Sequence, residues 1–158
     1  MKQNKRKTYA LWIGLTEAAG ILSGLLSRKG IQSFSETVTQ PVLSPPAILF
    51  PIVWTILYAL MGVGVARISL TSPSKERSKG LNIYIAQLIL NFFWSPIFFN
   101  ANAYGFALLW LLLLWTMVLW MILEFRKKDS IAAYLQIPYL IWLTFAVYLN
   151  YSVWQLNP

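Results

Sequence analysis

The chain has 158 residues, of which 58% are hydrophobic and only 11% are charged. Soluble domains carry roughly 25% charged residues, so these charges are too few to cover a surface that faces water. Cysteine and histidine are both absent, which excludes disulfides, the usual thiolate or imidazole metal sites, and nucleophilic catalysis built on those side chains. The composition predicts an all-α integral membrane protein with no metal and no cofactor, and it leaves an enzymatic role open.

Five apolar segments are each long enough to cross a bilayer, since a spanning helix needs about 20 residues. We therefore expect a five-transmembrane-helix bundle that forms a single domain over residues 1–158. The helices are expected at about 8–26, 44–68, 80–99, 104–125 and 130–154. The first segment resembles a signal peptide in its basic start. Glu17 interrupts the apolar stretch that a signal peptide requires, so we interpret the segment as the first span.

Residues 27–43 form the longest predicted loop, and they are mostly polar. Long loops often serve as lids, and a short helix inside this one fits its sequence. Ser44 is expected to cap the second helix, because serine side chains accept hydrogen bonds from the first helical turn. Pro51 lies deeper in that helix and should kink it or end its first turn.

Basic residues flank the predicted spans unevenly. Eleven of them fall in the N-terminal segment, the second loop and the fourth loop, and two (Arg28 and Lys29) fall in the first loop. Positive charge concentrates on the cytoplasmic side of membrane proteins. The sequence therefore predicts a cytoplasmic N-terminus and an outside C-terminus. The net charge of +8 is attributed to this topology, and no nucleic-acid partner is expected.

Three of the predicted helices have one face that is not simply apolar. Aromatic side chains gather on each of these faces, and on two of them an amide or a small residue joins them. The faces include Trp54 and Tyr58, then Asn91 and Trp94, and then Trp142, Phe145, Ala146 and Leu149. At 1.5 Å per residue, Trp54 and Asn91 lie about 12 Å and Trp142 about 18 Å from the outer side. These depths favour a pocket beneath the loop 27–43 that takes a flat, mostly apolar ligand. The alternative is that the faces only pack helices together.

Other polar and aromatic positions receive separate interpretations. Trp110, Trp115 and Trp120 recur every five residues and walk around their helix, so we expect them to face lipid or the interface without a ligand role. Asn150 lies near the end of its helix and is expected to meet water or the first loop. Glu17 either bonds a neighbouring helix or serves a ligand or a proton, because a carboxylate inside a membrane is a functional candidate.

Short motifs along the chain match a known family in their order. They are Pro41 with Ser44-Pro45-Pro46, then Phe50, Trp54, Leu57-Tyr58 and Gly62, then Gln87-Leu88, Leu90-Asn91, Trp94-Ser95 and Phe98-Phe99, and finally Pro138-Tyr139, Trp142, Phe145-Ala146, Leu149-Asn150 and Leu156-Asn157. Taken together with five spans, they resemble the TspO/MBR family. That family includes the tryptophan-rich sensory proteins of bacteria and the mitochondrial translocator protein, also known as the peripheral-type benzodiazepine receptor.

The resemblance implies a homodimeric bundle in a bacterial cell membrane, with a pocket closed by the first loop. Its implied role is a membrane receptor or carrier for porphyrins such as protoporphyrin IX, in tetrapyrrole homeostasis or stress signalling. The implied pocket residues are Trp54, Asn91, Trp94, Trp142, Ala146 and Leu149. Light-dependent porphyrin degradation and tetrapyrrole transport are the alternatives. Membrane lipid is the other expected partner.

This chain departs from the family pattern in its first loop and near its end. Phe34 and Ser35 stand where the family often has a Trp-Tyr pair, and Leu43 stands where it has a tryptophan. The residues after Tyr151 lack the basic position of the sterol motif found in animal members, so specific sterol binding is not expected. Arg28 and Lys29 could pair with ligand propionates, although they belong to no family motif.

Overall fold

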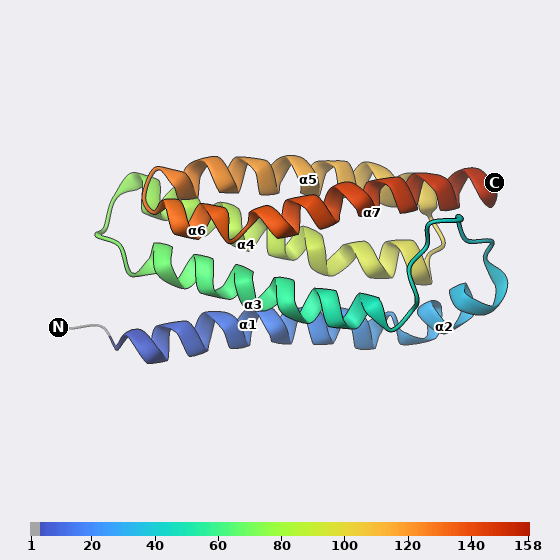
Figure 1. The fold of residues 1–158 in the computed structure, drawn as a ribbon, viewed down its shortest axis with the longest axis horizontal. Coiled ribbons are helices and arrows are strands. Elements are labelled where there is room, and N and C mark those ends of the chain that lie inside the picture. The colour runs from blue at the N-terminus through green and yellow to red at the C-terminus, as the bar shows by residue number, and fades with distance from the viewer. Residues whose placement is uncertain (1–3) are drawn as a thin grey trace.

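The computed structural model describes residues 4–158 as a bundle of long antiparallel helices (Figure 1). Four spans are formed by α1 (Lys5–Leu26), α3 (Leu49–Ser69), α4 (Lys75–Ser95), which the π-helical turn η1 (Pro96–Asn100) extends, and α5 (Tyr104–Arg126). The fifth span consists of α6 (Ser130–Tyr134) and α7 (Ile137–Leu156). All five are long and apolar enough to cross a membrane. The predicted all-α, five-helix integral membrane protein is confirmed.

The first loop contains the short helix α2 (Arg28–Thr37). It begins directly after α1, because only Ser27 separates the two helices. Arg28 and Lys29 therefore start α2 rather than end α1. Figure 1 shows α2 at the end of the bundle that also holds the C-terminus.

The second span begins later than its sequence predicts. The backbone N–H of Ser44 donates to Pro41 at 3.1 Å in a turn, and α3 starts only at Leu49, after Ile48, whose side chain makes no capping bond. The prediction of Ser44 as a cap is wrong because the turn positions Ser44 before the helix. Pro51 sits in the first turn of α3, where a missing N–H costs no helical bond.

The fifth span is broken before Pro138. The α6 turn is capped by Asp129, whose side chain accepts from the backbone of Ile131 at 2.9 Å, and α7 restarts at Ile137. Proline lacks the N–H that would continue a helical ladder. The break therefore follows from Pro138, and the prediction of one continuous helix over 130–154 is wrong at this point.

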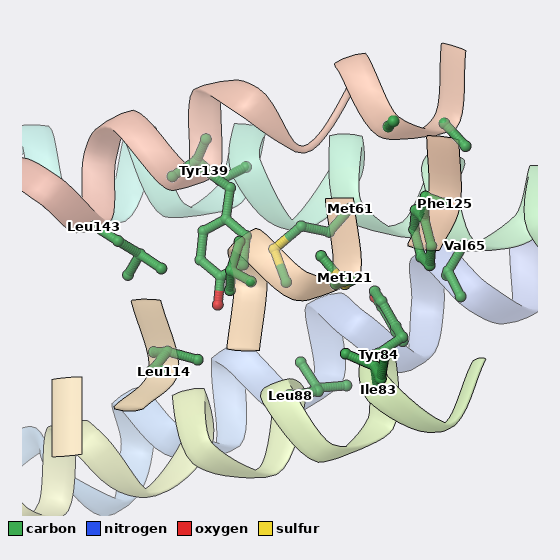
Figure 2. Close-up of a cluster of buried hydrophobic side chains, with 14 of the residues drawn as sticks. Met61, Val65, Ile83, Tyr84, Leu88, Leu114, Met121, Phe125, Tyr139 and Leu143 are labelled. Atoms are coloured by element: carbon green, nitrogen blue, oxygen red, sulfur yellow. The ribbon is translucent and has the colours of Figure 1, made fainter. Parts of the chain in front are cut away.

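One large core cluster fills the half of the bundle that contains the start of α1. Its largest members include the fully buried Met61, Tyr84, Met121, Phe125 and Tyr139, which converge from α3, α4, α5 and α7 (Figure 2). A smaller cluster near the C-terminus contains Phe98, Tyr104, Ala107 and Val153. Members of both clusters line a cavity that lies between them.

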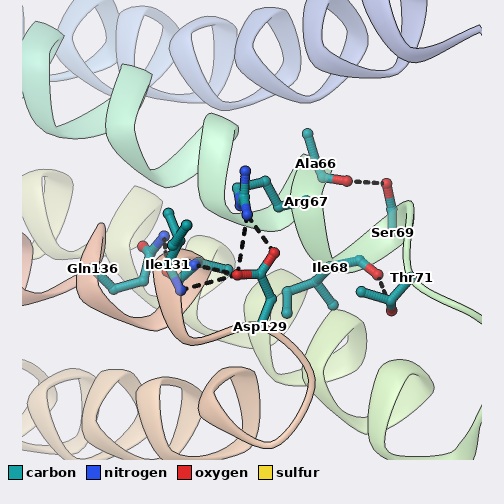
Figure 3. Close-up of polar contacts among 9 residues, drawn as sticks. Ala66, Arg67, Ile68, Ser69, Thr71, Asp129, Ile131 and Gln136 are labelled. Atoms are coloured by element: carbon teal, nitrogen blue, oxygen red, sulfur yellow. Dashed lines mark hydrogen bonds and ion pairs between the residues drawn. The ribbon is translucent and has the colours of Figure 1, made fainter.

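The predicted basic segments meet at one end of the molecule. The start of α1, the α3–α4 connection and the α5–α6 connection lie together there (Figure 1). Arg67 pairs with Asp129 at 2.9 Å across two of these segments (Figure 3). Lys2, counted with the N-terminal charges, lies outside the described residues. The direction of the bundle across the membrane stays a prediction.

Candidate ligand-binding cavity

A cavity of about 650 Å³ lies in the half of the bundle that carries α2 and the C-terminus. Every span contributes side chains to its lining, and so do α2 and the segment between α2 and α3. Pockets for small ligands commonly measure about 300–1,000 Å³. The cavity therefore lies where the sequence predicts one and has an ordinary size for a ligand site.

Most of the predicted site residues surround this cavity. Seven of them line it, namely Trp54, Tyr58, Asn91, Trp94, Trp142, Ala146 and Leu149. Phe145 instead lines an outer groove of about 470 Å³ with Pro138 and Ile141, between α3 and α7. Arg28 and Lys29 are exposed on α2 and are not among the lining residues, so the structure does not bring them to the others.

Aromatic rings form one wall of the cavity. Trp54 stacks on Tyr58 with ring centroids 5.2 Å apart, and it meets Trp142 edge-on at 6.5 Å. Phe50 packs against the other side of Trp142 at 5.9 Å. Aromatic rings prefer edge-on and stacked arrangements, so a further flat ring can pack against this wall in the same way. These contacts hold α3 and α7 around an apolar surface that can accept an aromatic ligand.

Asn91 belongs to a chain of buried hydrogen bonds at the inner end of the cavity. The Tyr58 hydroxyl donates to Asn91 Oδ1 at 2.8 Å, and Asn91 Nδ2 donates to the Tyr139 hydroxyl at 2.8 Å. Tyr139 in turn donates to Gln87 Oε1 at 2.8 Å. The amide of Asn91 is therefore mostly used to join helices, which limits what it can offer to a ligand.

Asn150 is a second buried amide beside the cavity. Only 1% of this residue is exposed. Its Oδ1 accepts from Trp94 Nε1 at 3.1 Å, and its Nδ2 donates to the Tyr104 carbonyl at 2.9 Å. The expectation that Asn150 meets water or the first loop is wrong, because α5 packs against this end of α7 and encloses the amide.

Glu17 extends into the cavity from the middle of α1. Its Oε1 atom is buried and has no hydrogen-bond partner among residues 4–158. Of the two interpretations drawn from the sequence, the structural bond to a neighbouring helix is not formed at this oxygen. The carboxyl group therefore remains available to whatever occupies the cavity.

The helix α2 and the segment 38–48 that follows it cover the cavity, and we refer to them together as the cover. Two sets of contacts attach the cover to the bundle. Phe34 of α2 packs on Phe98 and Phe99 of η1, with ring centroids 5.4 Å and 5.2 Å away. The side chain of Asn157 binds the backbone of Thr39 twice, at 3.1 Å and 2.9 Å. Leu43 is 65% exposed, so the position that holds a family tryptophan contributes little here.

Several aromatic residues that line or support the cavity are absent from the predicted site, among them Phe34, Phe98 and Phe99. Phe50 lines the cavity, and Tyr139 is fully buried at the centre of the hydrogen-bond chain (Figure 2). Both belong to the quoted motifs, and each lies three or four residues from a predicted tryptophan, Phe50 from Trp54 and Tyr139 from Trp142. A tyrosine in the middle of a membrane helix needs a partner for its hydroxyl, and that signal could have identified Tyr139.

The α5 tryptophans are only partly as expected. None of them is among the residues that line the cavity. Trp110 donates to the Leu90 carbonyl at 2.7 Å, and Trp115 donates to Thr144 at 2.9 Å, so both bind neighbouring helices as well as facing outward. Trp120 is the most exposed of the three and has the Lys79 ammonium 5.4 Å above its ring.

Comparison with known proteins gives consistent matches over most of the chain. The model of the TspO/MBR family matches residues 12–155. The Tryptophan-rich protein TspO of Chlorobaculum tepidum is 38% identical over 152 residues, which is 96% of each chain. The Translocator protein of Ovis aries is 39% identical over 123 residues, covering 77% of this chain and 73% of its own. The Protein CrtK of Rhodobacter capsulatus is 37% identical over 78% of each chain.

Proposed function

The chain belongs to the TspO/MBR family, and we propose that its cavity binds a porphyrin or another flat, mostly apolar molecule. The family relatives support a role as a membrane receptor or sensor. Within that role, we infer that ligand binding serves tetrapyrrole homeostasis or stress signalling. The ligand would enter from the membrane or the outer side and lie beneath α2.

The aromatic wall of the cavity carries this proposal. Trp54, Tyr58 and Trp142 present ring surfaces to one enclosed space. The amides of Asn91 and Asn150 are occupied by intramolecular hydrogen bonds, so the lining offers a large apolar area and few free polar groups. That combination favours a flat ligand which binds by stacking and needs few hydrogen bonds.

Titration with protoporphyrin IX tests the proposal directly. Quenching of tryptophan fluorescence in purified protein should saturate, and Trp142→Ala or Trp54→Ala should weaken the affinity about tenfold or more, since losing an aromatic contact costs about 0.5–1.5 kcal/mol beyond the lost apolar area. Trp120→Ala serves as the matched control, because Trp120 is exposed and outside the cavity. Equal affinity in all three variants would contradict the site.

The same samples separate the alternatives. Illumination of the bound porphyrin should leave its absorbance unchanged if the protein only binds it, whereas tryptophan-dependent loss of the porphyrin band would favour degradation. Net porphyrin movement into sealed proteoliposomes would favour transport. We also propose a homodimer, and light scattering of the detergent-solubilised protein measures its mass.

A further inference from the structure

The cavity has a polar corner on α1 that the aromatic wall does not use. Glu17, Gly20 and Gly24 are three and four residues apart, so they share one helix face, and all three line the cavity. A side chain at Gly24 would meet nothing within 4 Å. At Gly20 a Cβ would collide with the Tyr58 ring, so the room that this face leaves for part of a ligand lies at Gly24.

Glu17 differs from four other polar side chains around the cavity. Tyr58, Asn91, Trp94 and Asn150 have hydrogen-bond partners within the bundle. In contrast, the buried Oε1 of Glu17 has none among the residues that the structure describes. Glu17 is also the only acidic or basic residue in the described lining, so no cation of the cavity wall can neutralise it.

An unpaired carboxyl group inside a membrane bundle carries a large cost. Removing a charged or polar group from water without a partner is unfavourable, and intramembrane carboxylates therefore face cavities and mark ligand or ion paths. A ligand that brings an N–H donor or a positive charge to the Glu17 carboxyl group, which lines the cavity, reduces this cost. A ligand that brings a carboxylate to the same place adds repulsion.

We propose that Glu17 selects the ligand by accepting a hydrogen bond from an N–H group, with a protonated amine preferred, at the edge of a flat aromatic body. This inference rests on the proposed function, because the aromatic body occupies the wall formed by Trp54 and Trp142. For a porphyrin, the propionates then point away from α1. Ligands with an N–H on their rim are favoured over ligands with acidic rims on that side.

Three probes that share one ring system test the selection, namely pyrenylmethylammonium, 1-methylpyrene and pyrene-1-carboxylate. Energy transfer from tryptophan to pyrene reports binding to purified protein in zwitterionic nanodiscs. We expect the wild type to bind the ammonium probe about tenfold or more tightly than methylpyrene, since hydrogen bonds to charged groups are the stronger ones. Glu17→Gln should remove that preference while leaving the methylpyrene affinity within about twofold, and it should strengthen binding of the carboxylate.

Glu36→Gln is the matched control. It removes the same charge from α2 at an exposed position that does not line the cavity, so the preference for the ammonium probe should persist. A preference that survives Glu17→Gln, or that Glu36→Gln abolishes equally, overturns the inference. If methylpyrene does not bind, or binds without needing Trp142, the proposed function fails instead. If methylpyrene binding depends on Trp142 but the preference for the ammonium probe is unchanged in Glu17→Gln, the inference is overturned while the proposed function stands.

Discussion

Asn91 shows how a single amide can organise a membrane bundle. Through its two side-chain atoms it connects Tyr58 of α3 and Tyr139 of α7 to α4. Lipid offers no alternative partner for these groups, so the Tyr58 hydroxyl depends on the amide, whereas the Tyr139 hydroxyl also donates to Gln87. Hydrogen bonds between membrane helices average about 0.6 kcal/mol, whereas a buried group left without a partner costs about 1–3 kcal/mol.

We expect Asn91→Ala to destabilise the protein by about 1–3 kcal/mol, because it leaves the Tyr58 hydroxyl without its acceptor and removes the bond that the amide donates to Tyr139. Unfolding by SDS in mixed micelles measures the change. In the background of Tyr139→Phe, the same substitution should cost less, since the bond from Asn91 to the Tyr139 hydroxyl is already gone. Additive costs in the double variant would show that the chain does not act as a unit.

The contact between α1 and α3 depends on small residues. Gly62 of α3 lies against the backbone of Ile13 on α1, and a Cβ atom placed there would come 2.6 Å from the Ile13 Cα. Close approach of this kind is the usual role of small residues between membrane helices. Because the clash would be with backbone, only a shift of the whole helix could relieve it.

Gly62→Ala should therefore lower the SDS unfolding midpoint by the equivalent of about 1–3 kcal/mol, the usual cost of overpacking. Gly14→Ala on the facing helix is the control, because a Cβ there meets nothing within 4 Å and stability should hold or rise slightly. Equal losses of stability in both variants would show that alanine is unfavourable at either glycine for a reason other than this contact.

At the scale of the whole molecule, the segment between α2 and α3 closes one end of the bundle. The side chain of Asn157, near the C-terminus, holds this segment at the backbone of Thr39. These residues are 118 positions apart in the chain. The cover and the end of the fifth span are therefore coupled, although nothing in the local sequence of either segment requires it.

Asn157→Ala should loosen the cover without unfolding the bundle. Amide hydrogen exchange should become faster over residues 38–48, while exchange in α3 and α5 stays as in the wild type. Dissociation of a bound porphyrin should also speed up. Gln155→Ala, at an exposed neighbouring position, should change neither rate. Unchanged exchange over 38–48 would mean that the two hydrogen bonds do not restrain the segment.

The distribution of basic residues predicts the direction of the bundle across the membrane. The chain has no cysteine, so single cysteines can report the side directly. Val42→Cys, at a residue that is 99% exposed on the cover, should react with an impermeant maleimide in intact cells. Ser72→Cys, at an exposed position of the α3–α4 connection, should react only after permeabilisation. The reverse pattern would invert the predicted topology.

The sequence by itself determined the number of spans and seven of the residues that line the cavity. Apolar length fixes a membrane helix because lipid leaves the backbone no other partners, and face periodicity identified Trp54, Asn91 and Trp142 before any contact was known. It could not determine how far Asn91 and Asn150 are already committed to other side chains, nor that Phe145 turns outward. Those outcomes depend on rotation and break points of whole helices, such as the one before Pro138. Only the tertiary structure decided that the Glu17 oxygen is left without a partner, because pairing is a property of neighbouring helices and not of α1 alone.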